Sequence, residues 1–95
     1  MSITHKKVST TQIVTDRSCR LMGFLVGTDG TNDPTITMYD GTATSGNEVV
    51  PTNTYDASLL GLNGFMMDGS GIICDHGLYC EITCAGAVEV VVYYK

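Results

Sequence analysis

The sequence predicts an all-β protein: a small antiparallel β-sandwich or barrel, jelly-roll-like, with about seven or eight short strands. Two observations support this prediction. Short runs rich in Val, Ile, Thr, Tyr and Phe recur along the chain, separated by Gly, Asn and Asp, and no segment shows sustained helical periodicity. With 95 residues, 43% of them hydrophobic, the chain can build one modest core, to which burial in an oligomer would add stability.

The expected strands follow one another through short connections. They span residues 10–15, 19–26, 35–39, 48–50, 64–67, 72–73, 78–84 and 88–94. The dipeptide Asp40-Gly41 is a strong turn signal after the third strand. Pro34 and Pro51 lie in or beside expected connections, where a missing backbone donor is tolerated. A helical turn fits only in residues 55–62, where glycines keep it short.

The basic residues are concentrated at the start of the chain. Lys6, Lys7, Arg17 and Arg20 lie in the first twenty residues, and the next basic residue is Lys95. Every formal charge between Leu21 and Tyr94 is negative and the net charge is −5, so we expect neither a nucleic acid nor a membrane partner. We expect residues 1–9 to form a flexible basic N-terminal arm and residues 10–95 to form a single β-sandwich domain. The basic residues are then either solvated or in contact with an acidic neighbour, such as another copy of the chain.

The last expected strand is apolar at almost every position of Val88-Glu89-Val90-Val91-Val92-Tyr93-Tyr94. A strand with one solvated face would alternate apolar and polar residues. Both faces of this strand are therefore expected to be covered. Either a neighbouring subunit or a second core face within the monomer would provide the cover.

Three of the four cysteines lie in residues 73–84, together with His76 and two acidic residues. If residues 78–84 form a strand, Cys80 and Cys84 share a face but stand about 13 Å apart, too far for one zinc ion or a disulfide. Cys74 could still reach Cys80 across a hairpin, and Cys19 could pair with any of the three. Because the N-terminus lacks the apolar core of an export signal, reduced thiols are expected. We therefore predict neither a disulfide nor a metal site.

The polar motifs do not suggest catalysis. His76 is expected in an exposed turn, without the nucleophile and orienting group that a catalytic histidine requires. The segment Asp29-Gly30-Thr31-Asn32-Asp33 resembles the start of a calcium loop, but Pro34 stands where that loop requires glycine, which favours a polar turn. We predict no catalytic residue and no cofactor.

From Arg20 to Tyr94 the order of features resembles a group of small β-sandwich proteins of tailed bacteriophages, virion components such as head decoration or cement proteins. The likeness rests on five segments: Arg20-Leu21-Met22-Gly23-Phe24-Leu25-Val26, Thr35-Ile36-Thr37-Met38-Tyr39-Asp40-Gly41-Thr42, Gly64-Phe65, Gly77-Leu78-Tyr79-Cys80-Glu81-Ile82 and the closing strand. The cysteine cluster departs from the group's pattern.

The resemblance implies a non-enzymatic virion structural protein, most often a capsid decoration protein, that is made in the host bacterial cytoplasm and assembles on the particle. Its expected partners are copies of itself, with a trimer favoured, and the major capsid protein or another virion protein. The arm would then use Lys6 and Lys7 to grip an acidic neighbouring subunit, and deletion of residues 1–9 would weaken attachment without unfolding the domain.

Two other functions stay open. The first is a carbohydrate-binding or tail-associated adhesion module, for which the chain offers five tyrosines but no tryptophan. The second is a metal- or thiol-dependent binding protein that uses the cluster of Cys74, Cys80 and Cys84.

Overall fold

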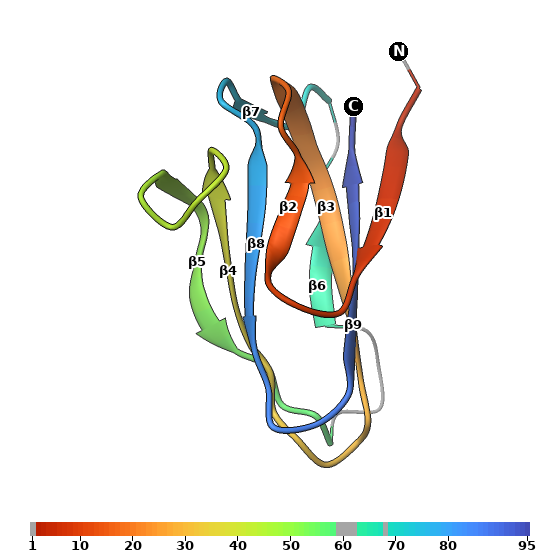
Figure 1. Ribbon diagram of the computed structural model, residues 1–95. Helices are drawn as coiled ribbons and strands as arrows, with labels where there is room; N and C mark the ends of the chain where they lie inside the picture. Colours follow the sequence, from red (N-terminus) through yellow and green to blue (C-terminus); the bar gives the residue numbers. More distant parts are fainter. Residues whose placement is uncertain (1, 59–62, 68) are drawn as a thin grey trace.

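The described part of the chain forms nine strands in two antiparallel sheets that pack face to face (Figure 1). This computed structural model describes residues 2–58, 63–67 and 69–95. The strands are β1 Thr4–Val8, β2 Gln12–Thr15, β3 Cys19–Thr28, β4 Thr35–Asp40, β5 Asn47–Thr54, β6 Asn63–Met66, β7 Ile72–Cys74, β8 Leu78–Thr83 and β9 Val88–Tyr94. The prediction of a small all-β antiparallel sandwich is confirmed. Nothing in the described residues forms a helix with the length and apolar character needed to cross a membrane.

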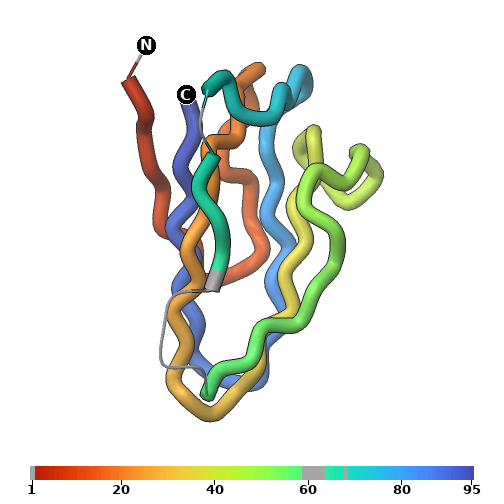
Figure 2. The backbone as a smooth tube through the Cα atoms, turned by 180° about the vertical axis from the view of Figure 1, so that it is seen from behind, coloured from red at the N-terminus to blue at the C-terminus, as the bar shows by residue number. Residues whose placement is uncertain are grey.

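The strand order is that of a jelly roll. The five-stranded sheet has the order β1-β9-β3-β6, with β7 also paired to β3, and the four-stranded sheet has the order β2-β8-β4-β5. Because β6 and β7 both pair with β3, they act as one interrupted strand, and eight strands then follow the jelly-roll order. The tube in Figure 2 shows the chain passing repeatedly from one sheet to the other.

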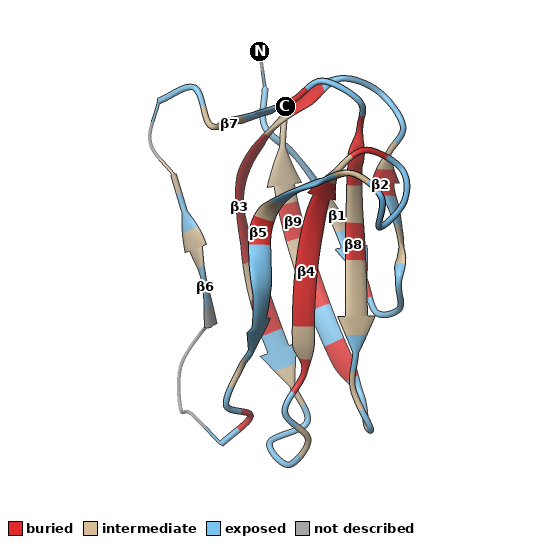
Figure 3. Cartoon of the chain, turned by 90° about the vertical axis from the view of Figure 1, so that its left-hand side faces the viewer, coloured by how far each residue is buried: buried red, intermediate tan, exposed pale blue. Residues whose placement is uncertain are grey.

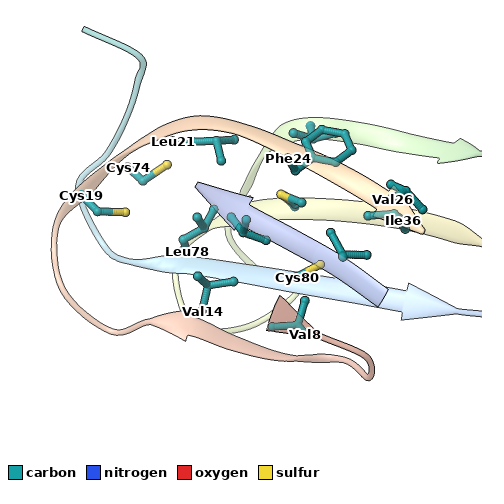
Figure 4. Packing of buried hydrophobic residues seen from close by; sticks show 14 of the residues in the cluster. Val8, Val14, Cys19, Leu21, Phe24, Val26, Ile36, Cys74, Leu78 and Cys80 are labelled. Carbon is teal, nitrogen blue, oxygen red and sulfur yellow. The ribbon is translucent and has the colours of Figure 1, made fainter. Parts of the chain in front are cut away.

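The hydrophobic core fills the space between the two sheets (Figure 4). Alternate residues of each strand point inward, because successive side chains of a β-strand lie on opposite faces. The five-stranded sheet contributes Val8, Leu21, Phe24, Val26, Val90 and Val92. The four-stranded sheet contributes Val14, Ile36, Met38, Leu78 and Cys80. Phe24 packs edge-on against Phe65, with ring centroids 5.0 Å apart.

Strand β4 is buried along most of its length, whereas its neighbour β5 is largely exposed (Figure 3). Strand β5 is the edge strand, and it is longer than the expected strand at residues 48–50. It runs through Pro51, which we expected beside a connection. An edge strand tolerates proline because one side of its backbone has no partner strand, and the β4–β5 ladder also shifts register near this point.

The N-terminal segment differs most from the expectation. Residues 4–8 were expected in a flexible basic arm, but they form β1, which pairs with β9 over its whole length. The side chain of Val8 is 0% exposed and belongs to the core. Sequence reasoning missed this strand because Val8 is its only strongly apolar residue. The pairing with β9, which is distant in sequence, accounts for the strand.

Residues 55–62 were expected to hold at most one helical turn. Residues 59–62 lie outside the described residues, and residues 55–58 contain a turn but no helix. Asp33, in the connection between β3 and β4, holds this segment in place. Its Oδ1 accepts a hydrogen bond of 2.8 Å from the backbone N–H of Ala57.

Candidate functional site

The candidate site is the outer face of the five-stranded sheet. Val88, Val90 and Val92 are buried in the core, so the residues between them on β9 point outward. The register of the ladders brings further side chains to the same side. The apolar face, as we call it, consists of Leu25, Met66, Ile73, Val91 and Tyr93.

Two of these side chains are strongly exposed. Met66 is 55% and Ile73 is 53% exposed, whereas Leu25, Val91 and Tyr93 are half-buried by their neighbours. The described residues form only two layers (Figure 1), so no described element covers the apolar face. Both faces of β9 were expected to be covered. The inner face is buried in the core, and the described residues provide no second core face over the outer one, so cover by a neighbouring subunit stays a prediction.

Glycines keep the middle of this face flat. Gly23 and Gly64 lie opposite Met66 and Leu25, respectively, and both have positive φ, +153° and +128°. A Cβ added at Gly23 would lie 2.8 Å from the Met66 Sδ, and one added at Gly64 would collide with the backbone oxygen of Phe24. Because neither Gly23 nor Gly64 has a side chain, β3 and β6 can approach closely, and the Met66 side chain can lie across β3.

Charged groups border the apolar face on the side of β1. The Lys7 Nζ lies 3.8 Å from the Glu89 Oε1, and both side chains are well exposed, so this pair adds little to stability. The ring of His5 lies beside that of Tyr93, with centroids 6.4 Å apart. The border thus carries both signs of charge within a short distance.

The four basic residues singled out in the sequence do not form one cluster. Lys7 points outward from β1, while the Lys6 Nζ donates a hydrogen bond of 3.3 Å to the backbone oxygen of Ile13 on β2. Arg17 is exposed in the connection between β2 and β3. Arg20 lies on β3 opposite Ile73, and its Nη1 donates a bond of 3.5 Å to the backbone oxygen of Ser70. Only Lys7 and Arg20 lie on the outer side of the five-stranded sheet.

The cysteines near the end of the chain are also separated. Cys74 lies on β7 opposite Cys19 on β3, whereas Cys80 lies on β8 in the other sheet. Burial raises the pKa of Cys80 to about 12. Cys84, one residue beyond β8, directs its Sγ toward the backbone oxygen of Asn32 at 3.7 Å. The fold therefore does not bring Cys74, Cys80 and Cys84 together as one ligand set, and the described residues contain no group of three or more His, Cys, Asp or Glu side chains placed to hold a metal.

The outer face of the four-stranded sheet is mostly polar and internally paired, apart from Ile13 on β2, which is 40% exposed. The hydroxyl groups of Thr37 and Thr52 are 2.7 Å apart. The hydroxyl of Tyr39 donates a bond of 2.9 Å to the Glu81 Oε1, and this bond raises the pKa of Tyr39. Tyr79 lies beside Tyr39, but Tyr39 is only 9% exposed. A sugar platform needs open aromatic rings, and this pair offers little open ring surface.

Polar loops at the two ends of the sandwich are held by carboxylates. The Asp29 Oδ1 accepts bonds from the backbone N–H groups of Thr31 and Asn32 at 2.9 and 2.8 Å, as expected for a polar turn. These bonds lower the pKa of Asp29 to about 2. At the other end the Asp40 Oδ1 accepts a bond of 2.9 Å from the backbone of His76, whose side chain is exposed.

Comparison of the chain with protein-family models, with curated proteins and with solved structures found no match.

Proposed function

We propose that the chain is a non-enzymatic structural protein of a tailed-bacteriophage virion, a capsid decoration or cement protein that acts by assembling on the particle surface. The observation that supports this proposal is the apolar face, which lies on a two-layer jelly roll and has no described cover. Contiguous apolar surface of this kind usually marks an interface with a protein or membrane. The net charge of −5 argues against an anionic membrane.

A second copy of the chain is the proposed occupant of the apolar face. Lys7 and Glu89 lie together at its border, so a neighbouring copy can meet each charge with the opposite one. A neutral, mixed border of this kind does not repel a copy of itself, although the chain as a whole is acidic. In the favoured trimer the face is directed toward the threefold axis, where each copy meets two neighbours.

The capsid partner would then be met by other surfaces of the oligomer. Arg17 is exposed in the connection between β2 and β3, and with Arg20 it supplies positive charge at one end of the sandwich. We propose that this end contacts an acidic surface of the major capsid protein or of another virion protein. The earlier expectation that Lys6 acts from a mobile arm is dropped, because Lys6 belongs to β1 and bonds to Ile13.

The experiment that tests the function is particle binding. Purified phage particles whose genome encodes the chain are analysed by mass spectrometry, and particles grown without the gene are then incubated with the purified chain. The expected result is that the chain binds those particles and that Arg17→Glu loses this binding. The control Thr83→Glu, at an exposed position of the other sheet and away from both proposed contact surfaces, should bind normally. The proposal would be contradicted if mass spectrometry did not find the chain in purified particles and if the purified chain also failed to bind particles grown without the gene. Recognition of immobilised glycans instead would favour the adhesion module.

A further inference from the structure

Cys19 and Cys74 form an opposed pair at one end of the five-stranded sheet. They are Cα partners in the β3–β7 ladder, and both are buried. Figure 4 shows the two side chains next to each other at the end of the core, beyond Leu21. Residues directly opposite each other in antiparallel strands have Cα atoms about 4.5–5.5 Å apart, within the range of about 4.4–6.8 Å that a disulfide spans. The backbone is therefore already placed for a covalent bond between them.

The two thiols are chemically unequal. Hydrogen bonding between them lowers the pKa of Cys19 and raises that of Cys74, and burial also raises the pKa of Cys74. Because the thiolate is the nucleophile in disulfide exchange, the lowered pKa of Cys19 favours this residue as the one that attacks the reagent.

Cys19 is also the less deeply buried member of the pair, since it is 8% exposed whereas Cys74 is 0% exposed. A surface pocket of about 410 Å³ is lined by Ser18, Cys19, Arg20, Ile73, Asp75 and Lys95. Its volume falls in the range of about 300–1,000 Å³ that is common for small-molecule sites. Cys74 does not line this pocket, so Cys19 is the member of the pair that lies next to a reagent held there.

We propose that Cys19 and Cys74 are a disulfide-forming site that is oxidised by a small organic disulfide such as glutathione disulfide. In the first step the Cys19 thiolate attacks one sulfur of the reagent, whose S–S bond breaks, and one small thiolate leaves. In the second step Cys74 loses its proton and its sulfur attacks the Cys19 sulfur, which releases the second small thiolate. The protein thiols lose two electrons, the reagent gains them, and the two protons end on the two released small thiols.

The other two cysteines do not take part in this site. Cys80 is fully buried in the opposite sheet, and Cys84 lies near Asn32 at the far end of the sandwich. The new bond would fasten the three-residue strand β7 to β3 and close a covalent loop from residue 19 to residue 74. Both cysteines belong to one chain, so the bond forms without a partner, although the pocket shares Ile73 with the apolar face.

The test is oxidation of the 95-residue chain in mixtures of reduced and oxidised glutathione, followed by blocking of free thiols and peptide mapping without reduction. The expected map has the peptides of Cys19 and Cys74 joined with the loss of two hydrogens, and both Cys80 and Cys84 blocked. Closing so long a loop is expected to raise the Tm by on the order of 10 °C. The variant Cys74→Ala should stop at the mixed disulfide of Cys19 with glutathione.

The control Cys84→Ala should leave the Cys19–Cys74 bond and the rise in Tm unchanged. The proposal would be overturned if the map showed no Cys19–Cys74 bond at any glutathione ratio. A disulfide from Cys74 to Cys80, or a disulfide between two chains, in place of the Cys19–Cys74 bond would overturn it as well. The map uses the unaltered chain, so the proposal stays testable even if Cys74→Ala does not fold.

Discussion

Val91 of β9 and Leu25 of β3 lie directly opposite each other, and both side chains point away from the core. Lys7 continues this row on β1, and Gly64 continues it on β6. The row crosses the middle of the five-stranded sheet, where the described residues provide no covering layer. A partner that packs here would bury Val91 on its second side, which would explain why β9 is apolar on both faces.

Val91→Lys should break the proposed self-association. A lysine at the centre of an apolar contact would be buried without a partner charge, which weakens binding by roughly 100-fold or more. Sedimentation velocity on a dilution series measures the effect. The matched control is Thr83→Lys, which adds the same charge at an exposed position on the other sheet and should leave the mass unchanged. Equal dissociation in both variants would point to a general charge effect instead of a specific contact.

Val8→Ala should lower the free energy of unfolding by about 2 kcal/mol, because it removes buried methyl groups and leaves a cavity between the sheets. Urea denaturation checks this value. In the control Ile3→Ala the altered side chain is half-exposed and lies outside β1, so the change should stay within about 0.5 kcal/mol. If the two variants unfold alike, β1 does not contribute Val8 to the core and the segment behaves as an arm.

Gly23→Ala should destabilise the fold by about 2 kcal/mol or more, because alanine at a positive φ is strained and its Cβ would collide with the backbone oxygen of Phe65 and press against Met66. Gly27→Ala is the matched control on the same strand. Its added Cβ would lie 3.7 Å from the nearest atom, the backbone oxygen of Glu89, so a much smaller change is expected. Thermal unfolding of the two variants side by side distinguishes them, and equal Tm values would show that β3 and β6 do not approach this closely.

Asp29 should make stability depend on pH in the acid range. Its pKa is lowered to about 2 by hydrogen bonds from Asn32 and Thr31. A carboxyl group with a lower pKa in the folded state stabilises the fold above its unfolded pKa, near 4, and loses this contribution as the pH falls toward 2. The variant Asp29→Asn should therefore differ from the parent at pH 6 and converge with it near pH 2 in thermal unfolding. A difference that persists at pH 2 would mean that another interaction is responsible.

Most strands could be predicted from the sequence because their residues carry the β-pattern locally. The segments around Phe24, Met38 and Val90 combine β-branched or aromatic residues with turn signals at their ends. Strand β1 could not be predicted in this way, since His5, Lys6 and Lys7 have no β-pattern and depend on pairing with β9.

The candidate site was predictable only in part. The sequence of β9 shows that Val91 and Tyr93 require cover, but it does not show which residues lie beside them. Leu25 and Met66 join them through the register of β3 with β9 and β6. The pairing of Cys19 with Cys74 depends in the same way on a ladder between strands that are distant in sequence. The spacing of the cysteines along the sequence therefore left several cysteine pairs possible.

The solution mass of the purified, reduced chain by light scattering tests most directly whether the apolar face is an assembly surface. We predict a closed oligomer that persists on dilution, with a mass of three times the 10.1 kDa chain for the favoured trimer. A mass equal to one chain at every concentration would contradict the proposal that copies of the chain cover Leu25, Met66, Val91 and Tyr93.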